Sequence, residues 1–369
     1  MRILFAFTGG RGHLEPLLPL AEAARTAGHV VAFGGRGSIL PVARQLGFDT
    51  FATEPVAKPP ERRPLQPLDP DREARDFREG FVLRSRDRIP GVEALCREWK
   101  PDVVVGEEAH YGALAVSERL EIPFASVVVL AAGTLAMAEL IAEPLNEVRA
   151  ERGLPPDPSA SMLSRSLVLA PLPPSFRDPA HPLPESTAYF RPFEQTPPLY
   201  DGPPRVYFTL GTVFNLESGD LLSRVLAGLA ELGVEVVATV GAGIDPGELG
   251  PLPPQVRVER FVPQAEIIAV CSAVVSHGGS GSVLGALAHG VPQVLIPMGA
   301  DQPLNATRSE ELGIARVLDP VAATPEDIRA AVSAVLEQPG YRAAARRLRS
   351  EFAALPGPEH AVTLLEGLR

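Results

Sequence analysis

The feature that most constrains the fold is a repeated alternation of short apolar runs with helical segments. In the first half, the runs RILFAF, HVVAFGG, KPDVVVGEE and PFASVVVLA are apolar on successive positions rather than alternate ones. Strands of this kind are covered on both faces, as in a parallel sheet whose crossovers are helices. The segments between the runs supply such helices, for example LEPLLPLAEAARTAG, which ends at Gly28.

The same alternation returns in the second half after a proline-rich stretch. Residues 171–204 contain eleven prolines and no clear periodicity, which is typical of a stiff linker or domain boundary. Beyond it, RVYFTLG, VEVVATV, AVVSHGG, QVLIPM and ARVLD predict strands separated by helices. The last of these helices opens with Thr324 and Asp327 at the spacing of an N-terminal capping box.

Two α/β units fit this pattern better than one, because 369 residues exceed what a single core usually holds. We predict two Rossmann-like doubly wound domains that face each other across a cleft at the carboxyl ends of their strands. The expected divisions are an N-terminal domain at 1–199 that ends in the proline-rich linker, a C-terminal domain at 200–350, and a helix within 351–369 that packs back on the N-terminal domain.

Charge and apolar content limit the partners of the chain. A net charge of −11 argues against nucleic acid or an anionic membrane surface as the main partner. No apolar run approaches the roughly 18 to 20 residues of a membrane span, and ILFAF is too short for a signal peptide. Cys96 and Cys271 are expected to be free thiols of a reducing compartment. We therefore expect a cytoplasmic protein, either a monomer or a homodimer.

The first candidate site is a glycine-rich turn after the first apolar run. It reads Thr8-Gly9-Gly10-Arg11-Gly12, and His13 stands where the next helix begins. Open α/β sheets bind ligands at this end of a strand. A dinucleotide fingerprint would need a glycine where Glu15 stands, so a nicotinamide cofactor is not expected. His13 is either an acid–base group that faces the cleft or a histidine that only caps or packs.

The second candidate site is the turn from His277 to Ser282. Its glycines let backbone N–H groups approach a phosphate, its serines add hydroxyl donors, and the helix that follows contributes a partial positive charge. No lysine follows the glycines, so the turn suits a diphosphate held without a Walker loop and without a metal. Downstream, Asp301 and Gln302 offer a carboxylate and an amide for sugar hydroxyls, although Asp301 is equally suited to cap a helix.

Three stretches resemble the family 1 glycosyltransferases of the GT-B fold, especially the bacterial natural-product enzymes. They are GRGHLEPLLPLAEAARTAGHVV, KPDVVVGEEAHYGALAVSERLEIPF, and residues 260–313 from RFVPQ to SEELG. The resemblance implies a metal-independent hexosyltransferase that moves a sugar with inversion from a dTDP- or UDP-sugar to a hydroxyl of an apolar natural product or phenolic aglycone. It assigns the acceptor to the N-terminal domain and the donor to the C-terminal domain, with no cofactor besides the nucleotide sugar.

The resemblance also implies roles for acceptor-side residues. His13 matches the general base that takes the acceptor's proton. Glu107 falls where the family usually has an aspartate that orients this histidine, and Glu108 beside it leaves the choice between the two open. Residues 51–95, where the family contacts the acceptor, match poorly. The frequent Phe, Leu, Met and Ala at 124–145 suit an apolar acceptor, or equally a core.

On the donor side, the resemblance implies contacts to the base, ribose, diphosphate and sugar. Phe261 stands where plant members stack a tryptophan on the base, Val262 would hold the base through its backbone, and Gln264 would reach the ribose. The residues that match the sugar and diphosphate contacts are Asp301, Gln302, Thr212, His277, Gly279, Ser280, Gly281 and Ser282.

Gly285 departs from the family pattern in an informative way. Plant UDP-sugar members have a glutamate there, which binds the ribose 2′- and 3′-hydroxyls, and its absence favours dTDP-sugars modestly because they lack a 2′-hydroxyl. Two other functions stay open: a nucleotide-sugar epimerase of the same fold, which needs no acceptor pocket, and a non-catalytic nucleotide-sugar-binding auxiliary protein. The presence of both His13 and the donor turn counts against the second.

Overall fold

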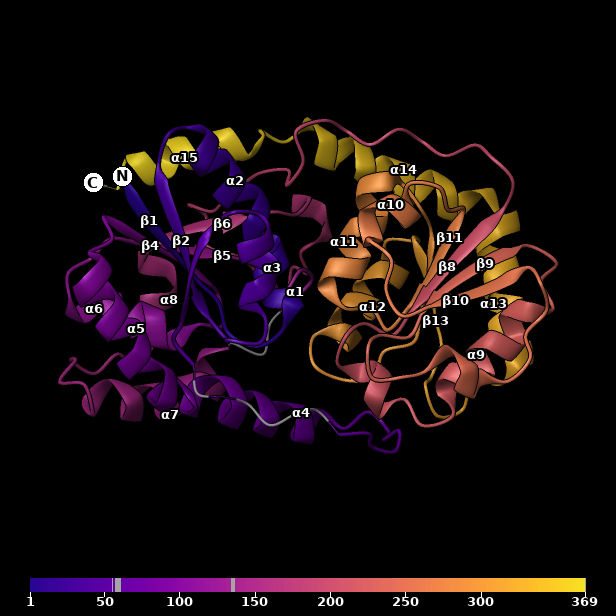
Figure 1. Ribbon diagram of the computed structural model, residues 1–369, viewed down its shortest axis with the longest axis horizontal. Coiled ribbons are helices and arrows are strands. Elements are labelled where there is room, and N and C mark those ends of the chain that lie inside the picture. The colour runs from indigo at the N-terminus through magenta and orange to yellow at the C-terminus, as the bar shows by residue number, and fades with distance from the viewer. Residues whose placement is uncertain (55, 57–60, 134–136, 369) are drawn as a thin grey trace.

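Two parallel sheets, one in each half of the chain, organise the computed structural model (Figure 1). The structure describes residues 1–54, 56, 61–133 and 137–368. The strands of the first sheet are β1 (Arg2–Ala6), β2 (Val30–Gly35), β3 (Asp49–Ala52), β4 (Val103–Glu107), β5 (Phe124–Val127), β6 (Leu167–Ala170) and β7 (Ala188–Tyr189). Those of the second are β8 (Arg205–Thr209), β9 (Glu235–Thr239), β10 (Val256–Glu259), β11 (Ala273–Ser276), β12 (Gln293–Leu295) and β13 (Ala315–Val317).

Helices connect the strands and cover both sheets. In the first half they are α1 (Arg11–Leu14), η1 (Glu15–Leu17), α2 (Leu18–Thr26), α3 (Leu40–Gln45), α4 (Pro70–Phe77), η2 (Arg78–Leu83), α5 (Ser85–Trp99), α6 (Tyr111–Arg119), α7 (Ala138–Ala150), α8 (Met162–Arg165) and η3 (Pro174–Phe176). In the second half they are η4 (Phe214–Glu217), α9 (Leu221–Ala230), η5 (Pro246–Leu249), α10 (Gln264–Ile268), α11 (Ser280–His289), α12 (Gln302–Glu311), α13 (Pro325–Glu337), α14 (Pro339–Ala354) and α15 (Pro358–Glu366).

Every strand pair in the two sheets is parallel, with orders β3-β2-β1-β4-β5-β6-β7 and β10-β9-β8-β11-β12-β13. Alternate residues of β1 explain why its run is continuously apolar. Ile3 and Phe5 enter one core cluster with α2 and α15, whereas Leu4 and Ala6 enter another with α5 and α6. The predicted fold class, two doubly wound α/β domains of the GT-B type, is therefore confirmed, since solved structures of that type also match the chain.

Two local predictions have different outcomes. Thr324 and Asp327 form the predicted capping box at the start of α13. The stretch 171–204 is more ordered than a bare linker, because Leu172 and Phe176 are fully buried and Ala188–Tyr189 pairs with β6 as an edge strand. This edge strand is only two residues long, and the N–H of Phe190 beyond it also donates to the carbonyl of Ala170.

The end of the chain returns to the first domain. Helix α14 packs against α11 of the second domain, and α15 then packs against α2 of the first (Figure 1). Ala361, Val362 and Leu365 of α15 are buried in the same cluster as Ile3 and Phe5. Among the described residues, every helix is too short or too polar to traverse a bilayer.

A second contact between the domains lies at the carboxyl end of β5. Val128, Ala131 and Ala132 share a buried cluster with Val283 of α11 and Ala306 of α12. The loop that follows β5 is therefore packed against the two helices that begin at the predicted donor site. Residues 134–136, which belong to the predicted acceptor-side stretch 124–145, lie outside the described residues.

Candidate active site

His13 and Glu107 meet because β1 and β4 are neighbouring parallel strands. Glu107 is the last residue of β4, and His13 lies in α1 directly after β1, so both stand at the carboxyl edge of the sheet. The Nδ1 atom of His13 is 3.3 Å from the Oε2 atom of Glu107. The two atoms are in contact without the alignment of a hydrogen bond, and the contact becomes an ion pair when His13 is protonated.

Glu107, rather than Glu108, is the carboxylate that faces His13. Glu107 is 1% exposed and accepts hydrogen bonds from the backbone N–H groups of Ala109 (2.8 Å) and Thr8 (3.3 Å). The side chain of Glu108 points elsewhere and accepts from the backbone N–H groups of Val129 and Leu130, each at 2.7 Å. The open choice between the two glutamates is resolved by geometry in favour of Glu107.

The electrostatics of this pair suit a base held by a carboxylate. Burial alone would lower the pKa of His13, but the charge and contact of Glu107, with smaller contributions from Asp301 and Glu108, raise the pKa above its ordinary value of 6.5. Burial opposes ionisation of Glu107, yet His13, His110 and the N–H of Ala109 together lower the pKa of this carboxyl. Glu107 is therefore ionised and favours a proton on His13.

Two aromatic neighbours of the pair were not expected from the sequence. The Phe81 ring stacks on the His13 ring with centroids 5.4 Å apart, which fixes the plane of the imidazole. His110 is buried, its Nδ1 accepts from the N–H of Ala113 at the start of α6, and burial lowers its pKa to about 4. Phe81 carried no local signal, because it lies in η2, far from His13 in sequence.

The donor turn has the backbone geometry of an anion site. Gly278 has φ of +83°, a conformation that favours glycine, and Gly279 is the N-cap of α11. Among the described residues, the backbone N–H groups of Gly279 and Gly281 make no hydrogen bond. They lie at the start of a ten-residue helix, where unpaired N–H groups and the helix dipole attract a negative group. Ser282 is buried in the same first turn.

His277, the first residue of this turn, is neutral. Burial lowers its pKa to about 4, although Asp301 and the Thr209 backbone act in the opposite direction. Its Nδ1 atom is buried without a hydrogen-bond partner among the described residues. A Cβ on Gly211 would come within 2.8 Å of the His277 ring, so the loop that carries Thr212 passes directly beside it.

The three residues predicted at the base and ribose lie together after β10. Phe261 is 58% exposed, and the guanidinium carbon of Arg11 lies 4.9 Å from the centre of its ring, which is a direct contact between the two domains. Val262 is half-buried between Phe261 and α10. Gln264 begins α10, and its Nε2 atom is buried without a partner among the described residues.

Ser280 and Asp301 are bonded to each other rather than left free for a ligand. The Ser280 hydroxyl donates to Oδ2 of Asp301 at 2.6 Å. Asn305 donates to the same oxygen at 2.8 Å and to the carbonyl of Gly278 at 2.9 Å. A phosphate contact from the Ser280 hydroxyl would need this bond to be exchanged. Asp301 is the N-cap residue of α12, but its side chain makes no capping bond.

Asn305 is a residue that the sequence reasoning did not single out. Its Oδ1 accepts from the N–H of Ala132 at 3.0 Å, and the Ser280 oxygen accepts from the N–H of Ala131 at 2.8 Å. The loop after β5 is thus bonded to the donor site of the other domain. Asp301 and Asn305 are four residues apart at the start of α12, and this spacing is the sequence feature that could have indicated their contact.

Gln302 holds the loop that precedes α12. Gln302 is buried, and its Oε1 accepts from the N–H of Met298 at 2.8 Å, which shapes the loop between β12 and α12.

The described part of the chain contains no group of three or more His, Cys, Asp or Glu side chains placed to hold a metal ion. Both predicted free thiols, Cys96 and Cys271, are unpaired and buried.

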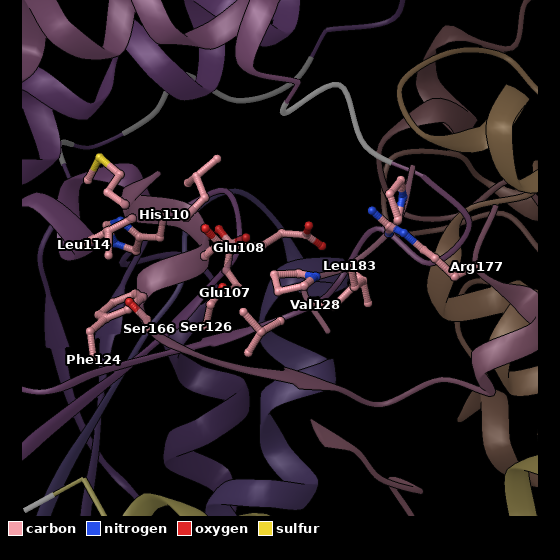
Figure 2. Close-up of a pocket in the computed structure, with 16 residues that line it drawn as sticks. Glu107, Glu108, His110, Leu114, Phe124, Ser126, Val128, Ser166, Arg177 and Leu183 are labelled. Atoms are coloured by element: carbon pink, nitrogen blue, oxygen red, sulfur yellow. The ribbon is translucent and has the colours of Figure 1, made fainter. Parts of the chain in front are cut away.

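A cavity of about 220 Å³ lies in the first domain next to the His13–Glu107 pair (Figure 2). Glu107 and Glu108 contribute to its wall at the end of β4. Much of the remaining wall is apolar and comes from α6, β5 with the loop after it, α8 and β6: Leu114, Phe124, Val128, Met162, Leu163 and Val168.

Comparisons with known proteins point to one class of enzyme. A family model described as the C-terminal domain of erythromycin biosynthesis protein CIII-like proteins matches residues 223–368. The chain is 31% identical to a 4′-demethylrebeccamycin synthase of Lentzea aerocolonigenes, over 100% of this chain and 99% of that protein.

Solved structures match over the same extent. The spinosyn rhamnosyltransferase SpnG matches with a TM-score of 0.82 at 23% identity, with both chains covered in full. The glycosyltransferase SsfS6 of Streptomyces sp. SF2575, solved with thymidine diphosphate, matches with a TM-score of 0.77 at 27% identity, over 100% of this chain and 99% of that one.

Proposed function

The chain belongs to the natural-product glycosyltransferases of the GT-B fold, and from this premise we propose that it transfers a sugar with inversion from a nucleoside-diphosphate donor to a hydroxyl of an apolar small molecule. The observation that carries the proposal is the buried Glu107 carboxylate 3.3 Å from His13, whose pKa is also raised by the charge of Asp301 from the donor side. The proposed reaction needs no metal, because the charges it develops are met by the chain's own groups.

His13 acts as the general base in this mechanism. Its Nδ1 side is occupied by Glu107, so Nε2 is the nitrogen available to take the proton of the acceptor hydroxyl. Glu107 stabilises the imidazolium that forms and keeps the ring in the required tautomer, as the aspartate of a Ser-His-Asp triad does. The acceptor oxygen attacks the anomeric carbon from the side opposite the diphosphate, which inverts the configuration in a single displacement.

The leaving diphosphate is stabilised at the start of α11. The unpaired N–H groups of Gly279 and Gly281 are in place before the reaction, so they meet the developing charge without reorganisation. His277 contributes as a neutral hydrogen-bond donor, because its low pKa keeps it uncharged at neutral pH. Asp301 would bind the donor sugar through Oδ1, since Oδ2 is already bonded to Ser280 and Asn305.

The nucleotide is proposed to be dTDP in preference to UDP. Gly285 leaves no carboxylate for a ribose 2′-hydroxyl, and the similar glycosyltransferase SsfS6 was solved with thymidine diphosphate. Phe261 offers an exposed ring for the base, and the unpaired Nε2 of Gln264 offers a donor for the sugar ring of the nucleotide.

Replacing Gly285 with glutamate is expected to shift nucleotide preference towards UDP. A Cβ at this position would meet only the Cδ1 atom of Ile268, at 3.4 Å, so the backbone has room for the start of a side chain. A carboxylate that accepts two ribose hydroxyls gains charge-assisted bonds of about 1.5–3 kcal/mol at best, whereas the deoxyribose of dTDP offers only one. The ratio of the two dissociation constants should move about tenfold, as measured by calorimetry.

Two controls make this measurement specific. Binding of dUDP isolates the 2′-hydroxyl from the methyl group of thymine, and Gly285→Gln supplies the same shape without the charge. Wild-type protein should bind dTDP at least as tightly as UDP. A strong wild-type preference for UDP would show that another residue binds the 2′-hydroxyl, and the proposed donor would be wrong.

A further inference from the structure

The cavity beside Glu107 is large enough to hold part of an acceptor. Its volume of about 220 Å³ exceeds the cavity of about 150 Å³ that is known to hold benzene in another protein, so a fused two-ring group fits. Glu107 belongs both to the cavity wall and to the pair with His13. A ligand whose inner end fills the cavity therefore has its outer end beside the proposed base.

Glu108 presents one carboxylate oxygen without a partner. Its Oε1 accepts from the N–H groups of Val129 and Leu130, each at 2.7 Å. Its Oε2 accepts no hydrogen bond among the described residues, and the side chain lines the cavity. In Figure 2 the side chain of Glu108 stands between the apolar wall and Arg177.

Arg177 presents an unpaired donor on the other side of the cavity. Only 7% of this residue is exposed. Its Nε donates to the carbonyl of His181 at 2.6 Å, and its Nη1 donates to the carbonyl of Leu130 at 2.7 Å. Its Nη2 makes no hydrogen bond within the described ranges, although Arg177 lines the cavity (Figure 2).

The side chains of Glu108 and Arg177 do not bond directly to each other. Their side chains form no ion pair, since no nitrogen of Arg177 lies within 4.0 Å of a Glu108 oxygen. Each charge acts on the other through space, but Glu108 is only half-buried, so water can reach the cavity. A ligand that displaces this water must replace its hydrogen bonds. The wall also contains Glu107, which is paired with His13, and the polar residues His110, Ser126, Ser164 and Ser166. Within this mixed wall, the free oxygen of Glu108 and the free nitrogen of Arg177 are the charged atoms that an occupant could bind.

We propose that the inner end of the acceptor occupies this cavity and carries a neutral group, such as a carboxamide or lactam, that donates to Glu108 and accepts from Arg177. The inference rests on the glycosyl transfer proposed above and names the class of acceptor. A carboxylate would be repelled by Glu108, and an ammonium group has no acceptor to offer Arg177. A bare hydrocarbon would leave both charges unpaired.

Four matched naphthols test the proposal by calorimetry at pH 8 with saturating dTDP. The probes are 2-naphthol, 6-hydroxy-2-naphthamide, 6-hydroxy-2-naphthoic acid and 6-(aminomethyl)-2-naphthol. The amide should bind wild-type protein at least about tenfold more tightly than 2-naphthol, whereas the two charged probes should bind no more tightly than 2-naphthol.

The variant Glu108→Gln should reverse part of this ranking. Glutamine keeps a carbonyl oxygen for Val129 and Leu130 but places an amide nitrogen where Oε2 faces the cavity. The naphthoic acid should then bind about tenfold more tightly than it binds wild-type protein, and the amide should lose affinity. Such a gain of binding cannot come from misfolding. Glu93→Gln, which removes a carboxylate paired with Arg97 outside the cavity, serves as the control and should leave the ranking unchanged.

Three results would overturn the proposal: equal affinity for the amide and 2-naphthol, an unchanged ranking in Glu108→Gln, or no binding of any probe. Equal affinity would mean that solvent alone pairs the two charges. None of these results bears on the transfer itself, which is followed separately through the hydrolysis of donor by water and through transfer to 2-naphthylmethanol. Failure of both of those reactions would count against the proposed function instead.

Discussion

His13→Ala is expected to lower turnover with an alcohol acceptor by about 10²- to 10⁴-fold, the usual contribution of a positioned general base. The alcohol proton is lost only as the new bond forms, so the variant lacks the group that is positioned to accept it. Affinity for dTDP should stay near that of wild-type protein, because His13 lies in the first domain and the diphosphate turn in the second. Steady-state transfer to 2-naphthylmethanol and calorimetry with dTDP measure the two effects.

The pH profile distinguishes a base from a residue that only packs. The pKa of His13 is raised by Glu107, and the base works in its neutral form, so kcat/KM should fall as the pH drops through a value above 6.5. In Glu107→Gln the carboxylate charge is lost, and the fall should move to lower pH. If His13→Ala retains more than half of the wild-type activity, or if Glu107→Gln leaves the acid limb in place, His13 is not the base.

Gly281→Val is expected to weaken dTDP binding by about a hundredfold or more while the fold is retained. Nothing lies within 4 Å of a Cβ at Gly281, so there is open space where the valine side chain begins and the fold is expected to be retained. Its side chain instead occupies space at the exposed start of α11, where the diphosphate would approach the unpaired N–H groups. The loss of two charge-assisted bonds of about 1.5–3 kcal/mol each accounts for the size of the effect.

The reason for this effect differs from what the glycine pattern alone suggests. A branched residue in a tight loop would be strained, but Gly281 lies in the first turn of α11, and Gly278 is the glycine of this turn with positive φ. Gly281→Ala, with a smaller side chain, should lose less affinity than Gly281→Val. Calorimetry alongside thermal unfolding separates binding from stability. Unchanged affinity in Gly281→Val would mean that the turn is structural only.

Local patterns predicted both turns and the central strands of the two sheets, but not β3, β6, β7 and β10. The continuously apolar runs of β1, β4, β8 and β11 are buried on both faces, and the glycines stand where strands end, so sequence-local rules apply. The pairing of His13 with the segment that holds Glu107 rested on resemblance to a family. Only the geometry of the structure chose Glu107 over Glu108.

Contacts that depend on tertiary packing could not be predicted. Phe81 reaches His13 from η2, within residues 51–95, where the resemblance to the family is weakest. Ser280 looked like a free hydroxyl at a helix start, but Asp301 and Asn305 from α12 bond it once the second sheet has formed. The bond from the loop after β5 to Asn305 requires both domains together, which no single segment encodes.

The central claim is a single displacement at the anomeric carbon with His13 as base, and the configuration of the product tests it most directly. The enzyme would be given whichever of dTDP-α-D-glucose and UDP-α-D-glucose it turns over, with 2-naphthylmethanol as acceptor. Proton NMR of the glycoside, recorded before equilibration, reports the coupling constant of the anomeric proton. The account predicts the β-glycoside alone, whereas formation of the α-glycoside would contradict it.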